Sequence, residues 1–226
     1  MDSIGHLFVL WREPVDGSRH VVGHLWRDRA DMAYCFAYVP DLSAVQALGF
    51  SALPEFARRS DGQPYRSPYL FPTFARRVPS PHRPDYRATV DAWGVVDGDD
   101  ALEILAKSGG VLLTDRIELA EYRGADDDLS TPLEFRVAGE KHRATTPVLA
   151  PGDRVQLKRQ PDNVHDTCAT FVLTLDGTPV GYVPRQYSAL IAGLVDRGVT
   201  LAAVAVRRLM LPEEAGRWVV RVGRGL

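Results

Sequence analysis

The second half of the chain is divided into short apolar runs, and this division restricts its fold more than any other feature of the sequence. Around Val155 and Phe171, apolar and polar residues alternate with the period of two that half-buried strands require. Asp176 and Gly177 form a hairpin signal. After Pro184 the spacing becomes that of one amphipathic helix. The predicted strands are residues 155–159, 171–175, 178–183, 199–211 and 217–222, and the helix ends at Gly198.

The first half combines strands with helices. Three runs rich in Val, Leu and aromatic residues, separated by polar turns, predict antiparallel strands at 7–11, 20–26 and 32–38. Ser67 and Pro68 indicate the start of a helix, because Pro favours the first turn. The predicted helices are residues 67–79, 84–93 and 99 or 100 to 107, and a last strand is expected at 114–122. The fold class is therefore α+β, mainly β.

The charge of the chain is unevenly distributed. A formal net charge of −2 excludes a protein that coats nucleic acid through bulk basicity. Residues 1–124 carry 14 Lys and Arg against 17 Asp and Glu, whereas residues 129–226 carry 13 against 9, so the halves have charges of −3 and +4. Between them the acidic run GADDDLSTP resembles a linker. We expect two domains, residues 1–124 and 131–226.

Several strings in the first half carry a family resemblance. VVGHLWRDRADMAYCFAYVPD, SALPEF, LFPTFARRVPS and DAWGV, within residues 6–110, resemble the N-terminal subdomain of HipA-type proteins. In that family a kinase-like body follows, but no Gly-rich loop, catalytic Lys strand or HRD-like segment follows here. The resemblance, together with the missing kinase core, implies an interaction or scaffold domain without phosphoryl transfer. The alternative that these residues form only the core of a small barrel stays open.

The second half of the chain carries another family resemblance. The pattern L-x-R-x-P-x-N-x-x-D-x-x-A and the string GYVP at 181–184 resemble the HIRAN domain. The pattern is formed by Leu157, Arg159, Pro161, Asn163, Asp166 and Ala169. The resemblance implies a compact β-barrel of SH3-like or OB-like character with one helix. The predicted architecture is thus a small HipA N-subdomain-like sheet with helices, followed by a HIRAN barrel.

The HIRAN resemblance also implies a binding site. In eukaryotic fork-remodelling relatives this domain captures the free 3′ end of single-stranded DNA. Phosphate binding needs cations, base stacking needs rings, and a terminal hydroxyl needs an acceptor such as Asp166, with Asn163 holding the loop. The predicted cations are Lys141, Arg143, Arg159 and Arg185. The predicted rings are His142, His165, Tyr182 and Tyr187.

Structural roles for some of these residues are also open. Asn163 and Asp166 stand in a PDNVHD turn, where such side chains commonly accept hydrogen bonds from backbone amides. Tyr182 on a strand fits a core or rim position as well as a stacking position. Asp162 replaces an Asn of the relatives and adds negative charge near the expected phosphate.

Catalytic and metal-binding patterns are missing from the sequence. His20 and His24 have a helical ligand spacing but lie in strand-like text, and no Cys-x-x-Cys motif is present. No phosphate-binding loop or nucleophile with a base can be identified, so we expect no enzyme activity, metal or cofactor. Cys35 and Cys168 are expected to be reduced. With no basic leader and no apolar run of about 18 residues, we expect a cytoplasmic protein without membrane contact.

These patterns lead to one functional hypothesis and one alternative. The first is a non-catalytic nucleic-acid-binding adaptor, whose HIRAN domain binds single-stranded DNA or a free 3′ end and whose N-terminal domain holds a protein partner. RNA stays open as the polymer. The alternative is a protein-contact regulatory component of a bacterial HipA-like toxin–antitoxin or phage-defence system.

Overall fold

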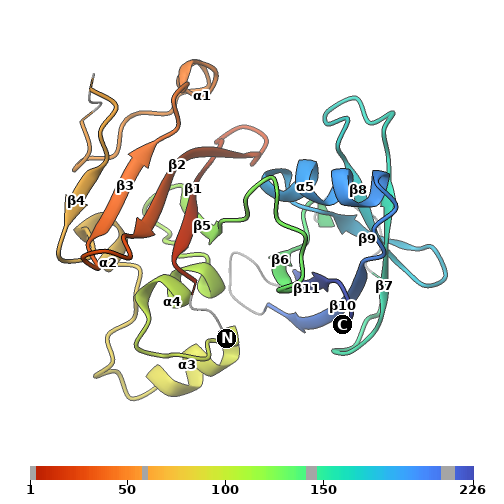
Figure 1. Ribbon diagram of the computed structural model, residues 1–226. Coiled ribbons are helices and arrows are strands. Elements are labelled where there is room, and N and C mark those ends of the chain that lie inside the picture. The colour runs from red at the N-terminus through yellow and green to blue at the C-terminus, as the bar shows by residue number, and fades with distance from the viewer. Residues whose placement is uncertain (1–3, 58–60, 141–146, 210–216) are drawn as a thin grey trace. The chain divides into compact units, whose positions relative to one another are not determined.

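The computed structural model describes residues 4–57, 61–140, 147–209 and 217–226 (Figure 1). The chain divides into two compact units, residues 1–122 and 123–226, and each is described by itself. Among the described residues, every helix is too short or too polar to span a bilayer.

The first unit is built on a five-stranded antiparallel sheet with the order β4-β3-β2-β1-β5. Its strands are β1 (His6–Arg12), β2 (Arg19–Arg27), β3 (Tyr34–Tyr38), β4 (Tyr65–Ser67) and β5 (Ile117–Glu121). The three predicted N-terminal strands and the last strand are therefore present. The predicted helix at Ser67 is wrong at its start, because Ser67 pairs with Tyr34 at the end of β4. Pairing across the sheet has overridden the local helix signal.

Short helices accompany this sheet in the described part of the unit: α1 (Ser43–Ala47), α2 (Pro72–Ala75), α3 (Tyr86–Trp93) and α4 (Ala101–Ser108). The sequence defines the ends of α4 clearly. Asp100 accepts hydrogen bonds from the backbone N–H groups of Leu102 and Glu103, and Gly109 ends the helix with a φ of 76°. The core of the unit includes Leu7, Val9, Leu25, Phe36, Phe74, Leu102, Leu105 and Leu119, so α2 and α4 pack on one face of the sheet.

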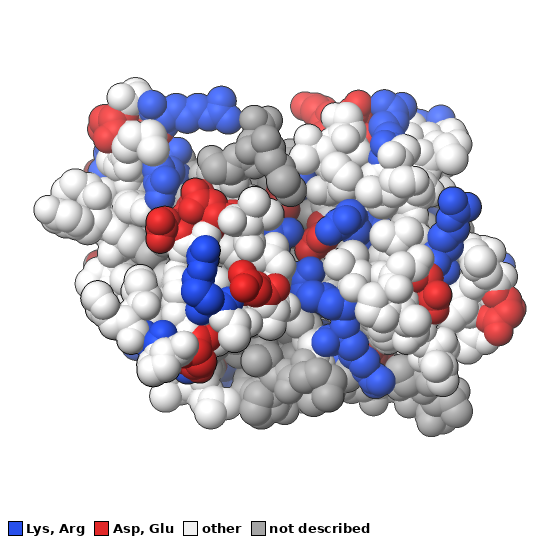
Figure 2. All heavy atoms as spheres, turned by 90° about the horizontal axis from the view of Figure 1, so that it is seen from below, with Lys and Arg blue, Asp and Glu red and all other residues white. Residues whose placement is uncertain are grey.

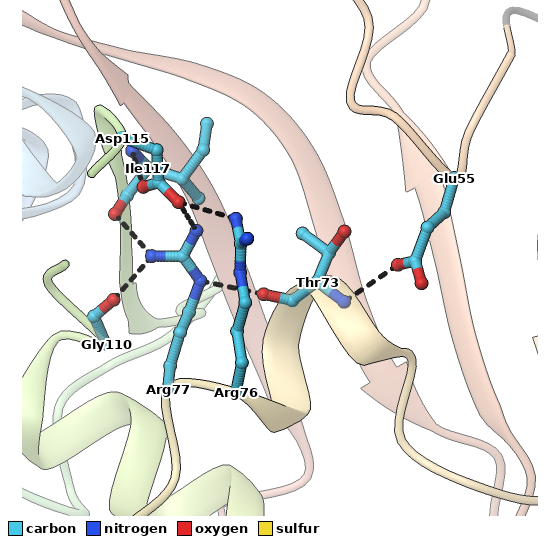
Figure 3. A network of polar contacts seen from close by, with 7 residues as sticks. All are labelled: Glu55, Thr73, Arg76, Arg77, Gly110, Asp115 and Ile117. Atoms are coloured by element: carbon cyan, nitrogen blue, oxygen red, sulfur yellow. Dashed lines mark hydrogen bonds and ion pairs between the residues drawn. The ribbon is translucent and has the colours of Figure 1, made fainter.

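One buried arginine connects three parts of this unit (Figure 3). The Arg77 side chain has no exposed surface. Its guanidinium donates hydrogen bonds to the carbonyl oxygens of Thr73 (3.0 Å), Gly110 (2.7 Å) and Ile117 (3.1 Å) and to Asp115 Oδ2 (2.6 Å). These contacts join α2, the end of α4 and the start of β5. The buried charge is thus both paired and hydrogen-bonded.

The second unit contains two three-stranded antiparallel sheets, with the orders β10-β11-β6 and β7-β8-β9. The strands are β6 (Leu133–Arg136), β7 (Val155–Arg159), β8 (Thr170–Thr174), β9 (Pro179–Tyr182), β10 (Ala202–Arg208) and β11 (Trp218–Gly223). Backbone bridges between Ala138 and Tyr182, and between Arg154 and Val204, connect the sheets at both sides. The strands of the two sheets therefore form a closed ring, as in the predicted barrel. Among the described residues of this unit, the helix is α5 (Arg185–Asp196).

The glycine of the GYVP string permits this closure. Ala138 and Tyr182 exchange two backbone hydrogen bonds of 2.8 Å. A Cβ atom on Gly181 would lie 2.4 Å from the carbonyl oxygen of Ala138 and 2.4 Å from the Val137 side chain. Any larger residue would push the two strand segments apart, so glycine is required by the close approach.

The acidic stretch expected to be a linker is folded onto the second unit. Leu129 has no exposed surface, and its carbonyl oxygen accepts a hydrogen bond from the backbone N–H of Arg224 at 3.0 Å. The carboxylates of Asp127 and Asp128 pair with Arg123 (3.1 Å) and Arg224 (3.0 Å). Their charges are therefore used within the fold.

We predict that Arg77→Leu destabilises the first unit much more than Arg76→Leu does. Both arginines pair with Asp115, but the Arg76 side chain is 53% exposed. Loss of the buried partner should cost about 3 kcal/mol, whereas loss of the exposed pair should cost about 1 kcal/mol or less. Urea denaturation of the full chain measures both, and equal costs would contradict the structural role of Arg77.

A pair of histidines in the same sheet generates a pH prediction. His6 Nε2 lies 3.2 Å from His24 Nδ1, and the His6 ring stacks on Tyr122 with centroids 4.0 Å apart. Burial and the neighbouring His24 lower the pKa of His6 to about 4, and burial lowers the pKa of His24. The unfolded chain binds protons at these histidines below about pH 6.5, where the folded chain does not.

The first unit should therefore lose about 1 to 2 kcal/mol of stability as the pH falls from 6.5 toward 4. His6→Phe should weaken this dependence, because it removes a group that resists protonation in the fold. Denaturation at pH 7 and pH 5 tests the expectation. An unchanged pH dependence in the variant would contradict it.

Candidate nucleic-acid interface

The 160–169 loop joins β7 to β8 and contains most of the predicted site. Its base is closed by the backbone N–H of Gln160, which donates to the Ala169 carbonyl at 2.9 Å. Inside the loop, Asn163 Oδ1 accepts from the backbone N–H groups of His165 (2.9 Å) and Asp166 (3.2 Å). Asn163 thus holds the turn, which is the structural role that its residue type allows. These hydrogen bonds restrain the backbone of the loop.

Asp166 ties this loop to the first turn of α5. Its Oδ1 accepts from the backbone N–H of Cys168 at 2.8 Å, and its Oδ2 accepts from Ser188 Oγ at 2.7 Å. Ser188 is buried, so the contact is shielded from water. Each carboxylate oxygen can accept more than one hydrogen bond, so the predicted contact with a sugar hydroxyl is compatible with these partners.

Arg159 lies at the end of β7, and its guanidinium is committed to the protein. Its Nε pairs with Asp196 Oδ1 at 3.0 Å, at the far end of α5. The Nη groups donate to the carbonyl oxygens of Ala169 (2.7 Å) and Thr167 (3.1 Å). Only 16% of the side chain is exposed. This geometry argues against the predicted phosphate contact and indicates that Arg159 holds the loop against α5.

Tyr182 occupies a half-buried position beside the loop. Its ring stacks on Phe171 of β8, with centroids 4.5 Å apart and an interplanar angle of 25°. Its hydroxyl donates to Gln160 Oε1 at 2.9 Å. The chain just after β6 also lies close to this ring. A Cβ atom on Gly139, whose φ is 76°, would lie 3.3 Å from the Tyr182 ring. Tyr182 is therefore a rim residue that connects the loop, β8 and the chain leaving β6.

Arg185 and His165 form the exposed part of the site. Arg185 is the first residue of α5, where the helix dipole favours anions. Its Nη2 approaches the carbonyl oxygen of His165 at 3.4 Å. Both side chains are exposed. The Arg185 cation therefore lies against the backbone of His165, where the loop meets the helix.

Three predicted residues, Lys141, His142 and Arg143, lie outside the described residues, and their contacts stay predictions. The residue before them is well held. The carboxylate of Glu140 is buried and accepts from the backbone N–H of Trp218 at 2.8 Å. Burial raises the pKa of Glu140 to about 6.

The predicted stacking role of Tyr187 is wrong, since only 1% of its surface is exposed. Its ring packs in the interior with Phe135, at a centroid distance of 6.2 Å. Gln160 and Ser188 were not predicted from the sequence. Ser188 had a detectable signal, because a polar residue on the buried face of an amphipathic helix needs a partner. Gln160 had none.

On the face drawn in Figure 2, Lys and Arg side chains are interspersed with Asp and Glu side chains. Glu134, for example, pairs with both Arg207 (3.0 Å) and Arg221 (2.7 Å). Within the described ranges, no group of three or more His, Cys, Asp and Glu side chains could hold a metal ion.

Comparison with known proteins identifies the second unit. Residues 132–212 match the HIRAN domain family, which confirms the predicted HIRAN domain. Two solved structures are similar: the HIRAN domain of human HLTF (21% identity, TM-score 0.35, 42% of this chain and 77% of that chain) and a protein from Lactobacillus plantarum (26%, 0.34, 40% and 91%). No curated protein sequence matches the chain.

The position of Arg159 leads to a prediction on stability. Arg159→Gln should lower the free energy of unfolding of the second unit by about 1 to 3 kcal/mol, because it removes a charged partner from Asp196 and two carbonyl oxygens. The neighbouring Lys158→Gln is the matched control, and its exposed side chain should contribute less than about 0.5 kcal/mol. Urea denaturation of the full chain compares the two. Equal effects would show that Arg159 does not hold the loop.

Proposed function

We propose that this protein is a non-catalytic nucleic-acid-binding adaptor whose HIRAN domain binds single-stranded DNA or a free 3′ end. The match of residues 132–212 to the HIRAN domain carries this proposal, because HIRAN is a DNA-binding domain. The strand is proposed to lie against the 160–169 loop, Tyr182 and the first turn of α5.

The chemistry of the described residues supports this placement. Arg185 supplies a cation at a helix N-terminus, which is a favourable position for a phosphate group. His165 and Tyr182 supply rings for bases, at roughly 1 to 3 kcal/mol per stacked base. Asp166 supplies an acceptor for a sugar hydroxyl at a strand end. All four belong to the loop or to the elements that its hydrogen bonds reach.

Preorganisation also supports binding at this loop. A loop that must be ordered by its ligand loses affinity to the entropy of ordering. Here a backbone hydrogen bond between Gln160 and Ala169 closes the loop, and the Asn163 side chain accepts from backbone N–H groups within it. Asp166 and Arg159 bind the loop to α5. The strand would therefore meet side chains that already have their positions.

For the first unit we propose contact with a protein partner. This role follows from the resemblance of residues 6–110 to the HipA N-terminal subdomain, which the family match to residues 132–212 does not test. The alternative function, a regulatory component of a HipA-like toxin–antitoxin or phage-defence system, depends on the same resemblance. Co-purification of the full chain with a kinase-like protein from the source cell would favour it.

The binding proposal is tested with labelled single strands that carry a free or a phosphate-blocked 3′ end. We expect the full chain to bind at low salt and the blocked end to bind more weakly. Arg185→Ala should weaken binding roughly tenfold, because it removes a charge-assisted phosphate contact. Fluorescence anisotropy measures each affinity.

The matched control is Arg197→Ala. Arg197 is also exposed but lies just after the other end of α5, so its loss changes the net charge equally without touching the site. Its affinity should stay within about twofold of wild type. Equal losses in the two variants would place the strand elsewhere, and no binding to any strand or to RNA would reject the function.

A further inference from the structure

The orientation of one side-chain amide in the 160–169 loop is set by the backbone. The N–H groups of His165 and Asp166 can only donate, so the Asn163 atom facing them at 2.9 and 3.2 Å must be the oxygen. The amino group of Asn163 then faces Gln160. Its Nδ2 donates to Gln160 Oε1 at 3.1 Å.

The same reasoning fixes the amide of Gln160. Because Asn163 presents a donor, Gln160 must present its oxygen, and that oxygen also accepts from the Tyr182 hydroxyl at 2.9 Å. The carboxamide therefore holds the loop and the Tyr182 ring together through one atom. Its plane and its polarity are determined by partners on two different elements.

These contacts use neither of the two N–H bonds of the Gln160 amino group. Among the described residues, no acceptor is within hydrogen-bond reach of Nε2, and the side chain is half-buried. Partial exposure lets water satisfy these donors in the unbound protein. A ligand lying between Tyr182 and Asn163 would meet an oriented N–H pair that needs an oxygen acceptor.

We propose that Gln160 is a further ligand-contacting residue of this interface. Its Oε1 positions Tyr182 and Asn163, and its Nε2 donates to an acceptor oxygen of the bound strand. This inference rests on the proposed function. It assigns to one uncharged side chain both the positioning of the stacking ring and a direct contact with nucleic acid.

Three variants separate the two roles. Gln160→Glu keeps an oxygen acceptor for Tyr182 and Asn163 but removes the donors and adds a negative charge. Gln156→Glu adds the same charge four residues earlier, on β7, at an exposed side chain whose Nε2 contacts the Leu175 carbonyl at 3.3 Å outside the loop. Gln160→Met removes both the acceptor and the donors.

Affinity for a single-stranded oligonucleotide, measured by anisotropy on the full chain, gives the first result. We expect Gln160→Glu and Gln160→Met to bind roughly tenfold more weakly than Gln156→Glu. If Gln160→Glu bound as well as Gln156→Glu, the ligand contact would be overturned. If Gln160→Met bound like wild type, neither role would stand.

A second measurement needs no ligand. In a double-mutant cycle on unfolding, Gln160→Met and Tyr182→Phe should be coupled by about fivefold in the unfolding equilibrium constant, because each removes the same hydrogen bond. Additive effects would overturn the positioning role. If the wild-type chain bound no strand, the proposed function and the ligand contact would both be rejected, and the cycle would still decide the positioning role.

Discussion

The second unit depends on the backbone bridge between Ala138 and Tyr182. This pair of 2.8 Å hydrogen bonds joins the two three-stranded sheets on one side, and the contact between Arg154 and Val204 joins them on the other. Gly181 permits the approach, since a Cβ there would overlap the facing carbonyl. The bridge also brings Tyr182 against Gly139. The same pair of hydrogen bonds therefore closes the barrel and places Tyr182 at the candidate interface.

From that point the interface is assembled by hydrogen bonds that run toward α5. The Tyr182 hydroxyl reaches Gln160, Gln160 reaches Asn163, and Asp166 reaches Ser188 on the helix. Arg159 attaches the base of the loop to the other end of the same helix. Most of these groups are uncharged or paired, so the loop is held by geometry more than by net charge. This arrangement suits a site that recognises a strand through a few oriented contacts.

Much of the second unit could be predicted from the sequence, because its strands have a clear period and its HIRAN string has fixed spacing. Tyr187 was misassigned although the apolar stripe of α5 already placed it with Leu190 and Ile191 on the buried face. The structural role of Arg159 could not be predicted from its neighbours in the sequence, since its partner Asp196 is 37 residues away. The residues around Ser67 also predicted a helix, but Ser67 instead pairs with β3 as a strand residue. The HipA resemblance of the first unit stays a prediction.

We propose that nucleic acid lies on the 160–169 loop and the start of α5. Titrating an unlabelled single strand into the isotope-labelled full chain, and following the backbone amide signals by NMR, tests it most directly. We expect the largest shifts on residues 160–169 and around Tyr182 and Arg185, with few in the first unit. Shifts concentrated in the five-stranded sheet, or on β10 and β11 away from the loop, would contradict it.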